Sequence, residues 1–134
     1  MFLNRLNTDE KESFLSLAVR AAEANETIAD EEYQMINDYC VEMNISSFDI
    51  QKAKSMEEVE AVFSCSDREI VNIVLLEAIG LMYADGDYDL EEKCFIYDLA
   101  SHLSVSSKKI ESIEAILEKY LQITEEIVSC IEQP

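Results

Sequence analysis

Apolar residues recur at intervals of three and four along almost the whole chain, and no segment alternates strictly between apolar and polar positions. This spacing is that of an amphipathic α-helix, whereas a half-buried strand alternates with a period of two. Only two glycines and one proline occur, and the proline is the last residue, so helices meet few interruptions. The pattern predicts an all-α protein.

Capping residues predict where the helices begin, because Ser, Thr, Asp and Asn side chains accept hydrogen bonds from the first free backbone N–H groups. A glutamate three positions later completes a capping box. We therefore expect about seven helices in a compact bundle that forms a single domain over residues 1–134. They cover residues 8–24 (capped by Thr8), residues 30–43, a short helix from SSFD (46–49), and helices from SMEE (55–58), SDRE (66–69), DLEE (89–92, ending near 103) and SVSS (104–107).

Two of these helices are unusual. The fifth is apolar almost all round, so we expect it to be the buried central helix. Its exception is Glu77, which we expect either to meet solvent at one end of the bundle or to pair with a base such as Arg20. The last helix, with a break near Thr124 left open, carries a set of large side chains on one face: Ile110, Ile113, Leu117, Tyr120, Ile127 and Ile131.

An internal repeat is visible at an offset of 60 residues. Residues 14–50 align without gaps to residues 74–110, with ten identities in 37 positions. The segment ADGDYDLEE (84–92) thus has a degenerate twin, ANETIADEE (24–32). We expect a helix, an acidic corner and a second helix to be used twice about a pseudo-twofold axis.

The acidic corner at 84–92 is the main candidate for chemistry. Hard cations such as Ca²⁺ and Mg²⁺ prefer carboxylate and carbonyl oxygens, and Asp85, Asp87, Asp89 and Glu92 supply several carboxylates within one short loop. An EF-hand does not fit, because its first and third ligand positions would fall on apolar or aromatic side chains. The corner therefore predicts a cation site of another kind.

Helix punctuation is the alternative interpretation of the same segment. Gly86 can end one helix in a left-handed conformation. Asp89 can cap the next helix while Glu92 returns a bond to the Asp89 backbone. Capping gives Asp85 and Asp87 no required role, so both interpretations stay open.

A family resemblance rests on residues 75–106, LLEAIGLMYADGDYDLEEKCFIYDLASHLSVS. This segment resembles the hallmark of the TerB-like, tellurite-resistance-associated helical proteins. The matching positions are Ala84, Asp85, Gly86 and Glu92, followed by Ile96, Leu99, Ala100 and Leu103. The resemblance implies an all-helical, duplicated fold, a link to bacterial stress responses including tellurite resistance, and divalent-cation binding at the acidic corner.

Carried over to the first half of the chain, the resemblance implies Asn25 and Glu32 as the matching candidates. Here the sequence departs from the pattern, since Asn25 replaces an aspartate and Glu26 replaces the glycine. Ala29 stands where the second corner has its capping Asp89. A neutral amide binds a cation more weakly than a carboxylate, so we expect the second corner to be the stronger site.

Charge restricts the partners. The chain has 10 Lys plus Arg against 29 Asp plus Glu, a formal net charge of −19. Such a field repels phosphate backbones and anionic headgroups and attracts basic protein surfaces. We expect a cytoplasmic monomer or homodimer with a basic protein partner, no nucleic acid and no membrane insertion, because neither a signal-peptide core nor a membrane-length apolar run occurs.

Three further expectations follow from the residue inventory. The four cysteines, at 40, 65, 94 and 130, form no CxxC pair, so we expect reduced thiols used as small core residues. We expect no enzymatic activity, since the single histidine, His102, has no evident nucleophile near it and no glycine-rich phosphate loop exists. Two alternatives to a cation-binding module stay open: a metal-free adaptor that docks through its acidic surface, and a mimic of DNA charge.

Overall fold

In a computed structural model, residues 1–23, 30–84 and 88–134 are described, with the side chains of residues 30–32 and 84 left aside. The described residues form helices and no strand, so the all-α prediction is confirmed. The elements are two 3₁₀ turns, η1 (Leu3–Arg5) and η2 (Ile50–Lys52), and six α-helices: α1 (Thr8–Glu23), α2 (Asp30–Glu42), α3 (Met56–Ser64), α4 (Arg68–Ala84), α5 (Leu90–His102) and α6 (Ser107–Glu132).

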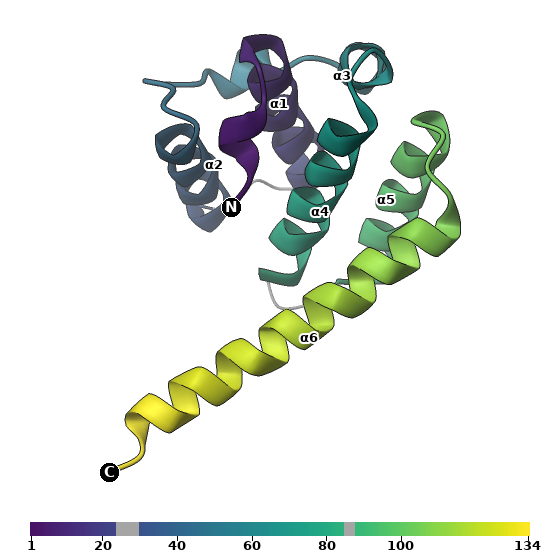
Figure 1. Cartoon of the computed structure of the whole chain (residues 1–134). Coiled ribbons are helices and arrows are strands. Elements are labelled where there is room, and N and C mark those ends of the chain that lie inside the picture. Colours follow the sequence, from purple (N-terminus) through teal and green to yellow (C-terminus); the bar gives the residue numbers. More distant parts are fainter. Residues whose placement is uncertain (24–29, 85–87) are drawn as a thin grey trace.

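Helix α4 lies between α1 on one side and α5 with α6 on the other, as Figure 1 shows. Seven of its residues are buried, among them Val74, Leu75 and Ile79 with no exposed surface at all. They pack with Phe14, Leu15 and other side chains in one hydrophobic core. The central position expected for this helix from its apolar sequence is therefore confirmed.

Three predictions about helix boundaries are wrong. The predicted third helix is only the turn η2, and its N-cap is Asp49 rather than Ser46, since Asp49 Oδ1 accepts from the Gln51 backbone. Helix α1 is capped by Asn7 instead of Thr8, since Asn7 Oδ1 accepts from the Glu10 backbone at 2.9 Å and Glu10 Oε1 accepts from the Asn7 backbone at 2.9 Å. Ser66 lies one residue before the N-cap position of α4, which begins at Arg68, and its hydroxyl donates to Glu10 Oε2 at 2.6 Å.

Corresponding elements of the two halves lie sixty positions apart. Helix α2 spans residues 30–42 and α5 spans residues 90–102, while α1 begins at 8 and α4 at 68. Helices α2 and α5 are each followed by a residue with positive φ, Asn44 at 58° after α2 and Ser104 at 59° after α5. The following N–H groups, of Ile45 and Val105, each donate a 2.8 Å bond to a carbonyl five residues back. Such a bond closes a Schellman motif.

Glu77 pairs with a cationic group, as one of its two expected environments required, but that group is the Met1 amino group rather than Arg20. Its side chain is only 12% exposed, and its Oε1 accepts a 2.9 Å hydrogen bond from the Phe2 backbone and lies 2.8 Å from the Met1 amino group. The predicted pair with Arg20 is wrong, because that guanidinium donates to the carbonyls of Lys54 and Ala53. A buried carboxylate needs such donors to offset its desolvation.

The expectation that the cysteines fill the core holds for one of the four. Cys40 is buried, and burial raises the pKa of its thiol. Cys65, Cys94 and Cys130 are free and exposed, because each lies on the outward face of its segment. None of the described helices is long and apolar enough to cross a membrane.

Candidate functional site

The acidic corner joins the end of α4 to the start of α5. Of its candidate ligands, Asp85 and Asp87 lie outside the described residues, as do Asn25 and the side chain of Glu32 in the twin corner. Asp89 and Glu92 lie within the described residues, at the start of α5.

Asp89 and Glu92 form the capping box that the sequence predicted. Asp89 Oδ1 accepts from the Glu92 backbone at 2.8 Å, and Glu92 Oε1 accepts from the Asp89 backbone at 3.2 Å. Glu92 is 3% exposed, whereas Asp89 lies at the surface. A carboxylate has about four lone-pair sites, so the exposed Asp89 keeps free positions for a further ligand while it caps the helix.

Three tyrosines gather on the α6 side of this corner, and sequence reasoning did not group them. Tyr83 lies in the last turn of α4, and its ring centroid lies 4.9 Å from that of Tyr88. The Tyr97 hydroxyl donates to Glu114 Oε1 at 2.9 Å, and the Tyr83 hydroxyl donates to Glu118 at 3.1 Å. Tyrosine–glutamate hydrogen bonds thus join α4 and α5, on either side of the corner, to α6.

Burial and the neighbouring carboxylates keep these phenols protonated. Desolvation, followed by the hydrogen bond to Glu118, raises the pKa of Tyr83 to about 12. Desolvation and the bond to Glu114 raise the pKa of Tyr97 to about 12, and burial raises that of Tyr88 further still. The Tyr88 hydroxyl and Glu114 Oε2 are buried and form no hydrogen bond of ordinary geometry among the described residues, although after desolvation the nearby Glu114 carboxylate helps to raise the pKa of Tyr88. No sequence signal paired these residues, because α6 is brought to the corner only by folding.

Within the described part of the chain, no three His, Cys, Asp or Glu side chains converge as metal ligands would. The cation site therefore stays a prediction, because Asp85, Asp87, Asn25 and the side chain of Glu32 lie outside the described residues. His102 lies apart from the corner, exposed at the end of α5, with its Nδ1 2.8 Å from Glu60 Oε1 on α3. This contact raises the pKa of His102.

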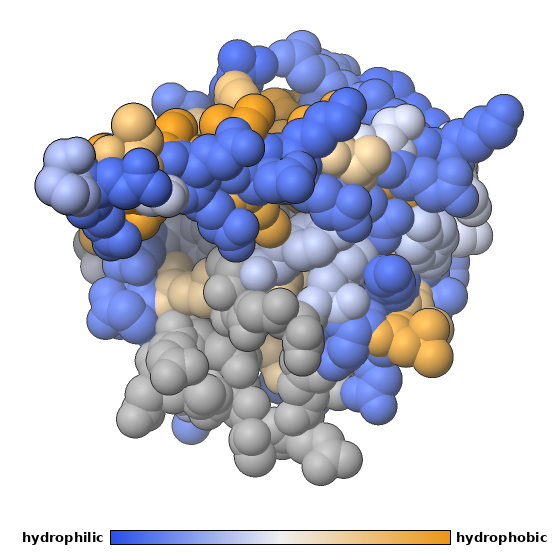
Figure 2. Space-filling view, turned by 90° about the horizontal axis from the view of Figure 1, so that it is seen from below, coloured by the Kyte–Doolittle hydropathy of each residue, from blue (hydrophilic) through white to orange (hydrophobic). Residues whose placement is uncertain are grey.

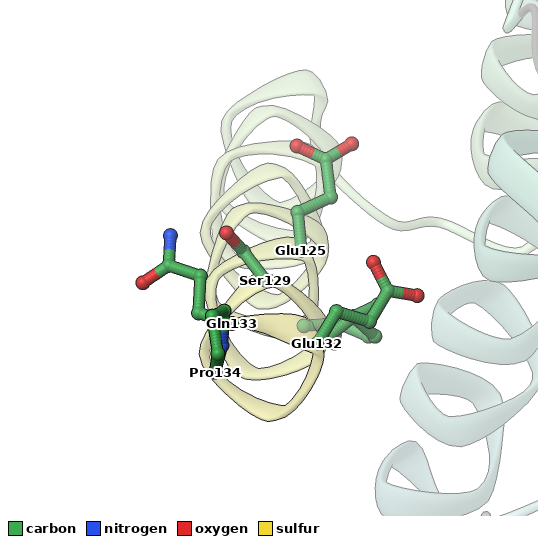
Figure 3. Close-up of a pocket in the computed structure, with 7 residues that line it drawn as sticks. Glu125, Ser129, Glu132, Gln133 and Pro134 are labelled. Atoms are coloured by element: carbon green, nitrogen blue, oxygen red, sulfur yellow. The ribbon is translucent and has the colours of Figure 1, made fainter.

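Several hollows are bounded by described residues, and two of them bear on function. The hollow drawn in Figure 3 is lined by the end of α6 and the two residues after it. Because residues from one end of a single helix form it, it is open and does not enclose a ligand. Another is an apolar groove between α4, α6 and the N-terminal segment, lined by Met1, Phe2, Leu76, Glu77, Gly80, Ile116, Leu117 and Tyr120.

Comparisons of the chain with protein-family models, with curated proteins and with solved structures found no match. The resemblance to the TerB-like proteins therefore stays a prediction from residues 75–106.

Proposed function

We propose that the chain is a small acidic binding module of the TerB-like kind, without catalysis, that docks on a basic surface of a partner protein in the cytoplasm during a bacterial stress response. The observation that carries this proposal is an acidic surface left largely without counter-charges. Only two ion pairs between an arginine and a carboxylate, Arg5–Glu69 and Arg20–Glu23, occur among the described residues.

Two other cationic side chains, Arg68 and Lys11, form hydrogen bonds with backbone carbonyls of the fold instead of with carboxylates. Arg68 donates to the carbonyls of Leu103 and Ser104, and Lys11 donates to the carbonyl of Met43. These bonds satisfy helix C-termini, where cations are favoured by the helix dipole. The chain has a net charge of −19, so its excess of carboxylates over cationic groups can attract a basic partner.

We place the docking surface on α5 and its capping corner. Asp89, Glu91 and Asp98 are all exposed there, and the seven-residue spacing of Glu91 and Asp98 puts them on one helix face. This face, formed by these three residues, is called the α5 acidic face below.

A pair of matched variants tests this assignment. Binding of a fluorescent oligolysine peptide is measured by anisotropy at physiological salt for Glu91→Gln/Asp98→Asn and for Glu125→Gln/Glu132→Gln, which removes the same charge from α6. The α5 acidic face predicts a larger loss of affinity in the first variant. Equal losses would show a diffuse ion atmosphere and overturn the docking surface.

A divalent cation bound at the acidic corner is the second candidate function, and the exposed carboxylate of Asp89 favours it. Calorimetric titration of chelator-stripped protein with Ca²⁺, Mg²⁺ and Mn²⁺ tests it, using Asp85→Asn/Asp87→Asn so that the capping box survives. Glu125→Gln/Glu132→Gln is again the control for lost charge. Saturable binding that disappears only in the corner variant supports a site; identical weak heats in all three proteins end this hypothesis.

We also propose that the two helix pairs arose as a duplicated unit. The support is the shared sixty-residue offset of α1 and α4, of α2 and α5, and of the two positive-φ residues Asn44 and Ser104. Short capping motifs recur in many helical proteins, so the joint agreement of boundaries and termini carries more weight than the sequence identities.

A further inference from the structure

Helix α6 leaves the bundle part-way along its length. Ile110 and Ile113 are buried in the core, but from residue 122 to the end every residue is exposed. Figure 1 shows this half of α6 continuing past α4 to the C-terminus without a neighbouring helix. An isolated helix of about 15 residues is marginal in water, so a partner on its apolar face would stabilise it.

The exposed face belongs to a seven-residue repeat that begins at the buried Ile113. With Ile113 taken as position a, the a positions are Ile113, Tyr120 and Ile127, and the d positions are Ile116, Ile123 and Cys130. The f positions, on the opposite side, are all glutamate: Glu111, Glu118, Glu125 and Glu132. Apolar a and d positions with charged f positions are the sequence pattern of helices that pair as coiled coils.

The large side chains of this face are open to solvent. Ile116, Tyr120, Ile123, Ile127, Val128 and Ile131 are each 46–76% exposed. Figure 2, seen from below, shows orange side chains along the α6 edge of the molecule, bordered by blue ones. Six half-exposed side chains present on the order of 600 Å² per chain, so two copies would bury ~1,200 Å², the lower bound of a specific interface.

The apolar groove continues this face onto the bundle. It opens between α4 and α6 beside Ile116 and Tyr120, and its floor lacks a side chain at Gly80. A Cβ built on Gly80 would meet only Leu117 Cδ2, at 4.0 Å. The groove can therefore receive an apolar side chain from outside.

We propose that a second copy of this chain covers this face, with the two α6 helices antiparallel. Pairing a with d positions sets Ile127 of one copy against Ile116 of the other, at the mouth of the groove, and Tyr120 against Ile123. In this register the g positions face each other and bring Lys119 of one copy near Glu126 of the other, twice in the dimer.

Charge favours this arrangement over the alternatives. In a parallel pair the C-terminal ends of the two α6 helices lie side by side and repel each other. Each end carries Glu125, Glu126 and Glu132 and has no Lys or Arg after Lys119. An anionic membrane surface would repel the same residues, and interfacial helices are usually rich in Lys and Arg on the polar face. An antiparallel pair also aligns the two helix dipoles favourably.

Sedimentation velocity over a range of concentrations around the micromolar tests the dimer. Ile123→Glu should weaken dimerisation by roughly 100-fold or more, because it buries an unpaired charge in the seam. Gln122→Glu adds the same charge at position c and should leave the dimer intact. A wild-type protein that stays monomeric, or equal effects of the two variants, overturns the proposal; urea unfolding of each variant shows that the bundle itself is folded.

Salt and a charge exchange test the surface and its orientation. Since each copy carries the same net charge, added salt should strengthen an apolar dimer, whereas it weakens docking on a basic partner. Lys119→Glu should weaken the dimer about 3- to 10-fold, and Lys119→Glu/Glu126→Lys should restore it. Failure of the double variant to restore the dimer rules out the antiparallel register.

Discussion

Glu92 is the residue at which capping and cation binding can be separated. We predict that Glu92→Ala destabilises the protein by about 2 kcal/mol. Loss of the reciprocal capping bond to the Asp89 backbone costs ~0.5–1 kcal/mol. The side chain is only 3% exposed, so removing its methylenes adds ~1 kcal/mol or more of lost burial.

The capping box of α3, formed by Ser55 and Glu58, provides a matched control. Glu58 Oε1 accepts a hydrogen bond from the Ser55 backbone N–H at 3.5 Å, as Glu92 does from Asp89, but the Glu58 side chain is exposed. Glu58→Ala should therefore cost only ~0.5 kcal/mol. Urea unfolding followed by circular dichroism, in the presence of a chelator, compares the two midpoints.

Two outcomes refute this reasoning. Equal destabilisation by the two substitutions means that burial adds nothing to the cap at α5. If Ca²⁺ or Mg²⁺ raises the midpoint of the wild type and Glu92→Gln abolishes the increase, Glu92 holds an ion besides capping the helix. Gln keeps an oxygen acceptor for the Asp89 N–H, so this variant isolates the charge.

Three further predictions concern single side chains. Asn44→Gly and Ser104→Gly should each stabilise the protein by about 0.5–1 kcal/mol in urea unfolding, because both residues have positive φ, and the corresponding alanine variants should destabilise it. Glu60→Gln should lower the raised pKa of His102, as measured by an NMR titration, and an unchanged pKa contradicts the pairing. Because the pKa of His102 is raised in the folded state, the pair stabilises the fold fully below the ordinary histidine pKa. This stabilisation is lost as the pH rises through the folded-state pKa. Buried Cys40 should resist a water-soluble maleimide in the native protein and react in urea, as mass spectrometry of the labelled peptides can show.

Much of the fold was predictable because it depends on local chemistry. The apolar period indicated the helices, and Ser55 and Asp89 cap α3 and α5 as expected. The failures are at positions where a side chain had two available partners. Ser66 follows the sequence rule for a cap, yet its hydroxyl is drawn to Glu10, which a distant part of the chain brings within 2.6 Å.

The candidate site was predictable only in part, for the same reason. The capping role of Asp89 and Glu92 involves residues three apart and was readable from the sequence. The contacts of Tyr83 and Tyr97 with α6 join residues that are 35 and 17 positions apart, and no local pattern specifies them. The partner of Glu77 was missed likewise, since it lies 75 positions away at Phe2.

The sequence by itself determined the helical class, the central place of α4, the acidic character and the seven-residue repeat of α6. These properties follow from composition and from periods that each helix carries within itself. Only the tertiary structure decided how much of α6 the bundle covers, leaving residues 122–132 exposed, and which donors reach the buried carboxylates. Burial and long-range hydrogen bonds depend on which helices meet, because a side chain bonds the nearest available partner in space rather than in sequence.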